Sequence, residues 1–120
     1  MVQITEIATD LKFPEGPIAM PDGSILLVEI AAGTLTRIST EGKKETVTEL
    51  GGGPNGAAIG PDGKCYICNN GGFEWHRSSK GLLFPGMQPV DYSGGRIERV
   101  DLTTGEVEVL YKECDGIPLK

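Results

Sequence analysis

The sequence contains few of the residues on which several protein classes depend. Among 120 residues there are three cysteines, one tryptophan and one histidine, and aromatic residues make up only 6%. Three cysteines cannot all pair, so disulfides are not the main source of stability and reduced thiols are expected. No apolar run approaches the length of a membrane span, and residues 1–6 lack the basic and apolar segments of a secretion signal. We therefore expect a cytoplasmic protein with no membrane partner.

Positive charge is also scarce. Eleven lysines and arginines are scattered singly among 17 acidic residues, which gives a net charge of -6. Proteins that bind nucleic acid gather basic residues along one face to contact the phosphates. We therefore do not expect nucleic acid as a partner.

Glycine and proline, in contrast, are plentiful. The chain has 18 glycines and eight prolines, and 38% hydrophobic with 23% charged residues is a globular balance. Many turn residues set among short β-prone runs are typical of an all-β fold rich in tight turns. Helix is expected to be scarce.

An internal repeat carries most of the information. The stretch PEGPIAMPDG at 14–23 returns as PNGAAIGPDG at 54–63, an offset of 40 residues (14 to 54). Each Pro-Asp-Gly lies between two β-prone runs and predicts a hairpin turn. The run that follows, at 24–30 and again at 64–70, has the continuous apolar character of a strand buried on both faces.

A second pair of similar segments completes the unit. Gly33–Ile38 resembles Gly95–Val100 in its alternation of polar and apolar residues, and each is followed by a turn and another alternating run. The unit therefore has four antiparallel strands in about 40 residues, which is typical of a β-propeller blade.

The repeat predicts how the chain is divided. Blade one is expected over 14–50 and blade two over 54–111, and 115–120 would begin a third blade. Residues 1–12 could form the strand that closes the ring. Two blades leave two apolar faces open, so the chain is either part of a longer protein or assembles from several copies. A two-sheet sandwich remains an alternative, although it does not explain the repeat.

The two units differ by an insertion at 71–93. It carries four of the seven aromatic residues of the chain, including Trp75, and contains the only histidine, His76. In an antiparallel meander this connection emerges at the end where the first strand begins. It is expected either to form a wall or lid over a central pocket or to be a surface loop that packs on its own blade.

Several polar residues are candidates for a site. Glu15 and Asn55 stand at equivalent strand entries and could present oxygen ligands to a hard cation, or could serve turn geometry before the glycines that follow them. Asn69 is expected to support a turn or to face the pocket. Cys65 and Cys68 lie three apart in one strand, so their side chains should point to opposite faces and not share a metal.

Five motifs together resemble the N-terminal part of the SMP-30/gluconolactonase family. The motifs are FPEGP at 13–17, GPNG at 53–56, NNGG at 69–72, YSGGRI at 92–97 and ECDG at 113–116. The resemblance implies a six-bladed β-propeller that hydrolyses sugar lactones at a central divalent metal, which would be calcium, magnesium, manganese or zinc. It also implies that Glu15 is a metal ligand.

The resemblance leaves part of the site outside the chain. The asparagine and aspartate that would complete the metal site, the latter also catalytic, would lie beyond Lys120. Asn55, Asn69, Trp75 and His76 are then candidate contacts for a small lactone. A non-catalytic blade module, or a truncated scaffold without a complete site, is the alternative function.

Overall fold

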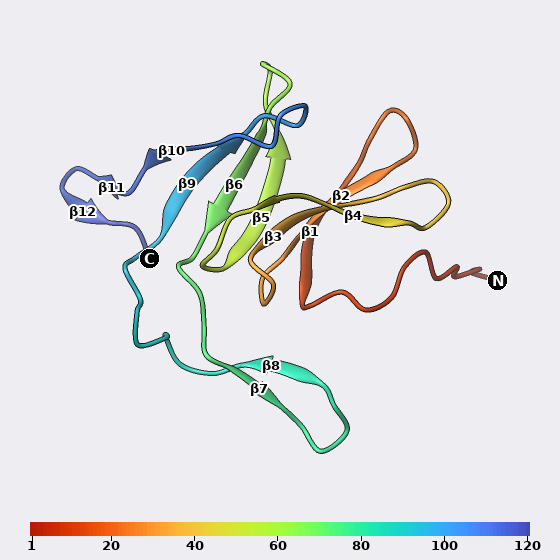
Figure 1. The fold of residues 1–120 in the computed structure, drawn as a ribbon, viewed down its shortest axis with the longest axis horizontal. Coiled ribbons are helices and arrows are strands. Elements are labelled where there is room, and N and C mark those ends of the chain that lie inside the picture. The colour runs from red at the N-terminus through yellow and green to blue at the C-terminus, as the bar shows by residue number, and fades with distance from the viewer.

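The computed structural model describes residues 1–120 and contains strands, turns and loops but no helix (Figure 1). It therefore contains no helix that could cross a membrane. Two four-stranded antiparallel sheets have the orders β1-β2-β3-β4 and β10-β9-β6-β5, and the pairs β7-β8 and β11-β12 stand apart. The strands are β1 (Pro14–Ala19), β2 (Ile25–Glu29), β3 (Thr34–Ile38), β4 (Lys44–Glu49), β5 (Pro54–Ile59), β6 (Cys65–Asn69), β7 (Trp75–Arg77), β8 (Leu83–Pro85), β9 (Arg96–Val100), β10 (Val107–Tyr111), β11 (Glu113–Cys114) and β12 (Ile117–Pro118). The predicted all-β class and the four-stranded sheets are confirmed.

The repeat is visible in the turn hydrogen bonds. In the first Pro-Asp-Gly turn the backbone N–H of Ser24 donates to Asp22 Oδ1 at 2.9 Å. Forty residues later the N–H of Lys64 donates to Asp62 Oδ1 at 3.0 Å. Both bonds fix an Asx-type turn between two strands. The predicted hairpins are therefore confirmed, with the same geometry in each unit.

The main core lies between the two sheets. Its fully or nearly fully buried members are Val28, Leu35, Leu50, Cys65, Ile67 and Val100. The alternating pattern explains this core, because every second residue of a strand points to the same face. Strands β1 and β5 are edge strands of their own sheets and lie side by side, so we call them the inner strands of the molecule. This arrangement brings the starts of both sheets to one end of the molecule (Figure 1).

Each sheet also has a second face. On the first sheet Leu27 and Ile38 point away from the second sheet, and residues 5–11 lie over them. On the second sheet the corresponding outward face is open, and Cys68 is exposed there. Residues 1–12 form no strand, so their ring-closing role stays a prediction.

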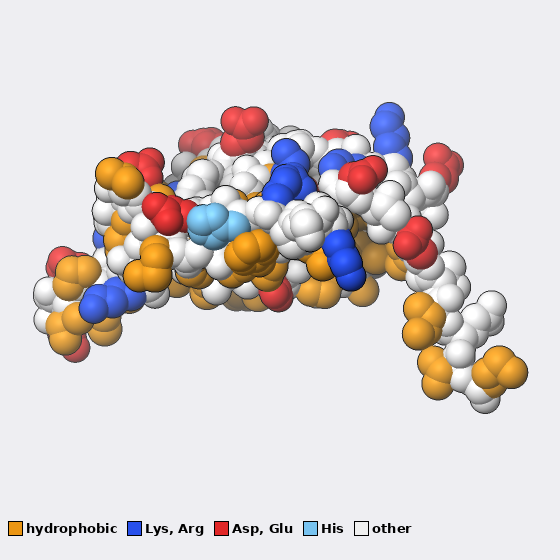
Figure 2. Space-filling view, turned by 90° about the horizontal axis from the view of Figure 1, so that it is seen from below, with side chains coloured by type: hydrophobic (Ala, Val, Ile, Leu, Met, Phe, Trp, Pro, Cys, Tyr) orange, Lys and Arg blue, Asp and Glu red, His pale blue; other side chains and the backbone are white.

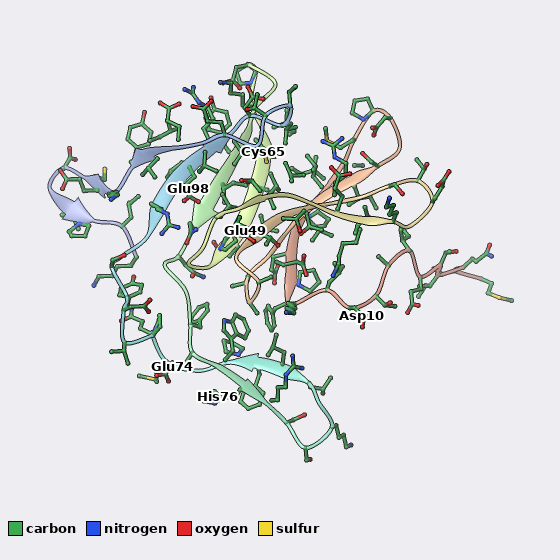
Figure 3. All side chains as sticks on the ribbon, in the orientation of Figure 1. Asp10, Glu49, Cys65, Glu74, His76 and Glu98 are labelled. Atoms are coloured by element: carbon green, nitrogen blue, oxygen red, sulfur yellow. The ribbon has the colours of Figure 1, made fainter.

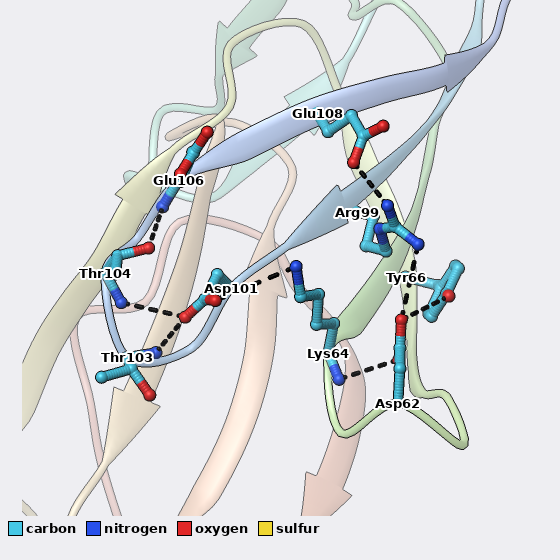
Figure 4. Close-up of polar contacts among 9 residues, drawn as sticks. All are labelled: Asp62, Lys64, Tyr66, Arg99, Asp101, Thr103, Thr104, Glu106 and Glu108. Carbon is cyan, nitrogen blue, oxygen red and sulfur yellow. Dashed lines mark hydrogen bonds and ion pairs between the residues drawn. The ribbon is translucent and has the colours of Figure 1, made fainter.

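Charged residues at the end of the second sheet that carries the Asp62 turn form a surface network (Figure 4). Arg99 contacts Glu108 at 2.6 Å and Asp62 at 3.5 Å. The pKa of Asp62 is held below its ordinary value, first by the backbone N–H of Lys64 and then by the Tyr66 hydroxyl and Arg99. These groups are solvent-exposed, and exposed ion pairs stabilise a fold only weakly. We assign them to turn geometry rather than to a site.

The cysteines follow the strand alternation. Cys65 is buried whereas Cys68 and Cys114 are exposed, and no disulfide forms. The prediction that Cys65 and Cys68 point to opposite faces is confirmed. Burial raises the pKa of the Cys65 thiol to about 11. Because the thiolate is the reactive form, Cys65 should be inert in the folded chain.

Thiol labelling tests this difference. At pH 8 a thiol reagent should modify Cys68 and Cys114 rapidly in the folded chain, and Cys65 only after denaturation. A Cys65→Ala variant should leave the count of fast-reacting thiols unchanged. Three thiols reacting at one rate without denaturant would contradict the burial of Cys65.

Candidate functional site

The insertion meets the starts of the inner strands at one end of the molecule. Trp75 of β7 packs on Phe13, the residue before β1, with ring centroids 5.2 Å apart. Phe73 adds an edge-on contact to Trp75 at 6.0 Å. The insertion therefore reaches across to the first sheet instead of packing on its own sheet alone. The prediction that the insertion covers a central pocket remains a prediction.

Figure 2 views the molecule from this end and shows the single histidine on the surface beside hydrophobic side chains. His76 is exposed and lies against Phe84 at a centroid distance of 5.5 Å. Figure 3 shows it on the β7-β8 hairpin, away from the sheets that carry Cys65 and Glu98. The predicted contact of His76 with a ligand stays a prediction.

Glu15 and Asn55 occupy irregular points of the two inner strands. Both are exposed, and the pairing register shifts just after Glu15 in β1 and across Asn55 in β5. A Cβ added at Gly16 would lie 3.0 Å from the backbone nitrogen of Ala57. Since the strands touch there, Glu15 and Asn55 are held on neighbouring strands at the same end.

The residues of this chain do not complete a cation site. No three His, Cys, Asp or Glu side chains come together. Calcium requires six to eight oxygen ligands and structural zinc four, whereas Glu15 and Asn55 offer one carboxylate and one amide. Further ligands would have to come from outside the chain, and we derive no catalytic step through a metal.

Asn69 lies at the end of β6 and is 4% exposed. Its Oδ1 accepts from the N–H groups of Gly53 at 2.9 Å and Gly71 at 3.0 Å. Its Nδ2 donates to the carbonyl of Gly51 at 3.0 Å and to Glu98 at 3.2 Å. These four bonds use the full hydrogen-bonding capacity of the amide. Asn69 therefore supports the turn at Gly71 and the inter-sheet linker, which is the segment Leu50–Gly53 between β4 and β5. Its amide has no free polar atom for a ligand.

A largely buried ion pair, in which the Arg96 side chain is 18% exposed, extends this network. Glu98 is 2% exposed and accepts from Arg96 Nε at 2.5 Å. Arg96 Nη2 also donates to the carbonyl of Leu50 at 2.8 Å. Neither residue was predicted from the sequence to be part of this network. The signal was present, because Glu98 stands in phase with Val100, a core position of the same alternating strand.

In the first sheet, the position that corresponds to Asn69 is Glu29, 40 residues earlier in the chain. Glu29 ends β2, is 4% exposed, and accepts from Thr36 at 2.6 Å and from the N–H of Lys12 at 2.7 Å. Burial by itself would raise the pKa of Glu29, but the bonds from Thr36, Lys12 and Thr34 and the charge of Lys44 together lower it. The carboxylate is therefore ionised and holds the segment that leads into β1.

This lowered pKa predicts a pH-dependent effect of Thr36→Val. A carboxyl with a depressed folded pKa stabilises the fold above its unfolded value, and that stability is lost as pH falls through the folded pKa. Losing the Thr36 bond should cost about 1.5–3 kcal/mol at pH 7 and less as the pH falls through the folded pKa and Glu29 takes up a proton. Urea unfolding at pH 7 and pH 3 measures this. The exposed Thr46→Val is the control, and an equal cost at both pH values would contradict the assignment.

Two cavities lie at this end of the molecule. One, of about 300 Å³, is lined by Trp75, Phe73, Arg96, Asp91, Ser93 and small residues. The other, of about 250 Å³, includes Asn55, Asn69, Cys68 and Arg96. Trp75 and Asn55 thus line separate cavities, and Glu15 and His76 line neither. Arg96 and Ser93 were not predicted from the sequence to line a cavity.

Comparisons with known proteins bear on the family. No curated protein matches the chain. The solved structures that are similar to it include two lyases. A streptogramin B lyase is 16% identical over 82% of this chain and 40% of its own, with a TM-score of 0.46. A virginiamycin B lyase from Staphylococcus aureus, solved in selenomethionine form, is 19% identical over 87% and 43%, with a TM-score of 0.44.

The chain spans less than half the length of either lyase. In sequence, residues 13–119 match the family described as SMP-30/Gluconolactonase/LRE-like region. That match covers the two four-stranded sheets, the insertion and the C-terminal β11-β12 pair. The chain therefore belongs to the SMP-30/gluconolactonase/LRE-like family.

Proposed function

We propose that this chain is part of a metal-dependent lactonase of the gluconolactonase type, and that Glu15 is one ligand of its divalent cation. The observation that carries the proposal is the placement of Glu15. It is an exposed carboxylate at a register shift of an inner strand, at the end that the insertion reaches. Membership of the family over residues 13–119 supports the lactone as the substrate class.

The remaining parts of the site would come from further blades. The open outward face of the second sheet is where a third blade of the same chain, or another copy, would pack. Asn55 and Trp75 would then contact the lactone from neighbouring positions on this end. Three cysteines without a disulfide fit a reducing compartment, which supports a cytoplasmic location.

The test combines solution mass, metal titration and activity. The chain is mixed with calcium, magnesium, manganese or zinc, and lactone hydrolysis is followed by acid release while light scattering reports the assembly. We expect metal-dependent turnover in ring-sized assemblies. Glu15→Gln should lower it by at least about 100-fold, because even residues that only orient ligands are worth 10–100-fold.

Glu49→Gln is the matched control, since Glu49 is also an exposed strand carboxylate but ends the outer strand β4. It should leave turnover and metal binding unchanged. Turnover that survives Glu15→Gln would remove Glu15 from the site. A folded monomer that neither binds metal nor hydrolyses lactones would favour the non-catalytic blade module.

A further inference from the structure

The chain contains two Asn-Gly pairs, Asn55-Gly56 in β5 and Asn70-Gly71 directly after β6. Asparagine is a thermolabile residue, because the backbone nitrogen of the next residue can attack its side-chain amide. Glycine has no Cβ and leaves that nitrogen unhindered. Both pairs are therefore chemically able to deamidate, and the fold decides which of them reacts.

Asn55 is the extra residue of a β-bulge. Pro54 pairs with Asn69 and Gly56 pairs with Cys68, so Asn55 has no partner on the neighbouring strand. A bulge leaves its extra residue unpaired and disrupts the ladder locally. The side chain of Asn55 is also exposed and makes no hydrogen bond within the chain. Its amide carbon is thus accessible, and no bond holds it away from the backbone.

The space beside Gly56 is open. Only the Cβ of Cys68, at 3.7 Å, lies within 4 Å of a Cβ added at Gly56. A ring that closes between Asn55 and Gly56 therefore meets no close neighbour on the side of the missing side chain.

Asn70 is held in place instead. Its Oδ1 accepts from the N–H of Gly72 at 2.9 Å and occupies the position that a Cβ of Gly53 would take. The attacking nitrogen is held too, because the N–H of Gly71 donates to Asn69 Oδ1 at 3.0 Å. These bonds must open before a ring can close, so the folded chain protects Asn70.

We infer that Asn55-Gly56 is a spontaneous modification site of the folded chain. The backbone nitrogen of Gly56 loses its proton to solvent base and attacks Cγ of Asn55. The new C–N bond closes a cyclic imide, and the side-chain nitrogen leaves as ammonia. Water then opens the imide at one of its two carbonyls, which gives aspartate or isoaspartate and requires no oxidant or cofactor.

The product changes the charge of the end where β1 and β5 meet. A carboxylate replaces the amide on the strand next to that of Glu15, and the net charge goes from -6 to -7 through one added carboxylate. In the first unit Glu15 itself stands at the corresponding position, so this reaction is confined to the second unit. Any effect on cation binding rests on the proposed function, whereas the modification itself requires no metal.

Mass spectrometry after incubation in mildly alkaline buffer with a chelator tests the inference. Trypsin places the two pairs in separate peptides, 45–64 and 65–77, and each deamidation adds one mass unit to its peptide. In the folded chain Asn55 should convert at least about 10-fold faster than Asn70, because hydrogen bonds must first open at Asn70. In urea the two rates should come within a few fold of each other.

Gly56→Ala is the matched variant, because its Cβ fits the fold but hinders the attacking nitrogen. It should slow the conversion of Asn55 severalfold, whereas Gly63→Ala in the same peptide should not. Unfolding midpoints check that both variants fold, and the comparison of folded and urea-unfolded chain needs no variant. Equal rates at Asn55 and Asn70 in the folded chain, no conversion of Asn55, or a ratio that persists in urea would each overturn the inference.

Discussion

Glu98→Ala should destabilise the folded chain by about 3 kcal/mol, because removing one partner of a buried ion pair leaves the other charge uncompensated, and the 18% exposure of the Arg96 side chain keeps the cost at the low end of the range. Arg96 would keep its bond to the carbonyl of Leu50 but lose the carboxylate at its Nε. Asn69 would lose one of the two acceptors of its Nδ2 group. Urea unfolding followed by Trp75 fluorescence measures the loss.

Glu108→Ala provides the control. Glu108 also pairs with an arginine, at 2.6 Å, but its side chain is 57% exposed. Exposed pairs contribute at most about 1 kcal/mol, so this variant should stay within that range. Replacing both Arg96 and Glu98 by apolar residues should recover much of the stability. If Glu98→Ala and Glu108→Ala had equal effects, the network would not hold the two sheets together.

Gly16→Ala should cost about 2–5 kcal/mol, which combines two independent effects. The residue has a φ of +59°, and a side chain in the left-handed region costs about 1–2 kcal/mol. The new Cβ would also lie 3.0 Å from Ala57 N and 3.3 Å from Gly56 Cα, which forces the inner strands apart at about 1–3 kcal/mol. Thermal or urea unfolding measures the sum.

Gly63→Ala separates the two effects. Its φ is +76°, but nothing lies within 4 Å of the added Cβ. It should therefore show only the backbone cost of about 1–2 kcal/mol. The difference between the variants measures the contact between β1 and β5. Equal costs would mean that the strands do not touch at Gly16.

Local patterns were sufficient for much of the fold. The Pro-Asp-Gly turns specify hairpins through an aspartate side chain and the glycine directly after it, and both turns form as expected. Strand alternation correctly placed Cys65 inside and Cys68 outside. These features depend on neighbours within a few residues, which a sequence displays directly.

The buried polar groups depend on residues far apart in the chain. Glu29 and Asn69 stand 40 residues apart at the same register, yet one is a carboxylate bonded to hydroxyls and the other an amide. In the second sheet the carboxylate is instead that of Glu98 on the adjacent strand, at the position that corresponds to Thr36 in the first sheet. Each sheet has a hydrogen-bond acceptor and donors at this register. The acceptor can stand on the second strand of the sheet, as Glu29 does, or on the third, as Glu98 does. A repeat in sequence therefore indicates the position and not the partner.

The amino-acid sequence by itself determined the turns, the alternation and the recurrence of a four-stranded unit, because these follow from short-range sterics and from which residues avoid water. Only the tertiary structure decided that Asn69 and Arg96 hold the linker at Leu50–Gly53, that the insertion rests on Phe13, and that Trp75 and Asp91 line one cavity. Those contacts join segments 16 to 62 residues apart (53 to 69, and 13 to 75). Their partners are selected by packing between sheets, which local pattern does not encode.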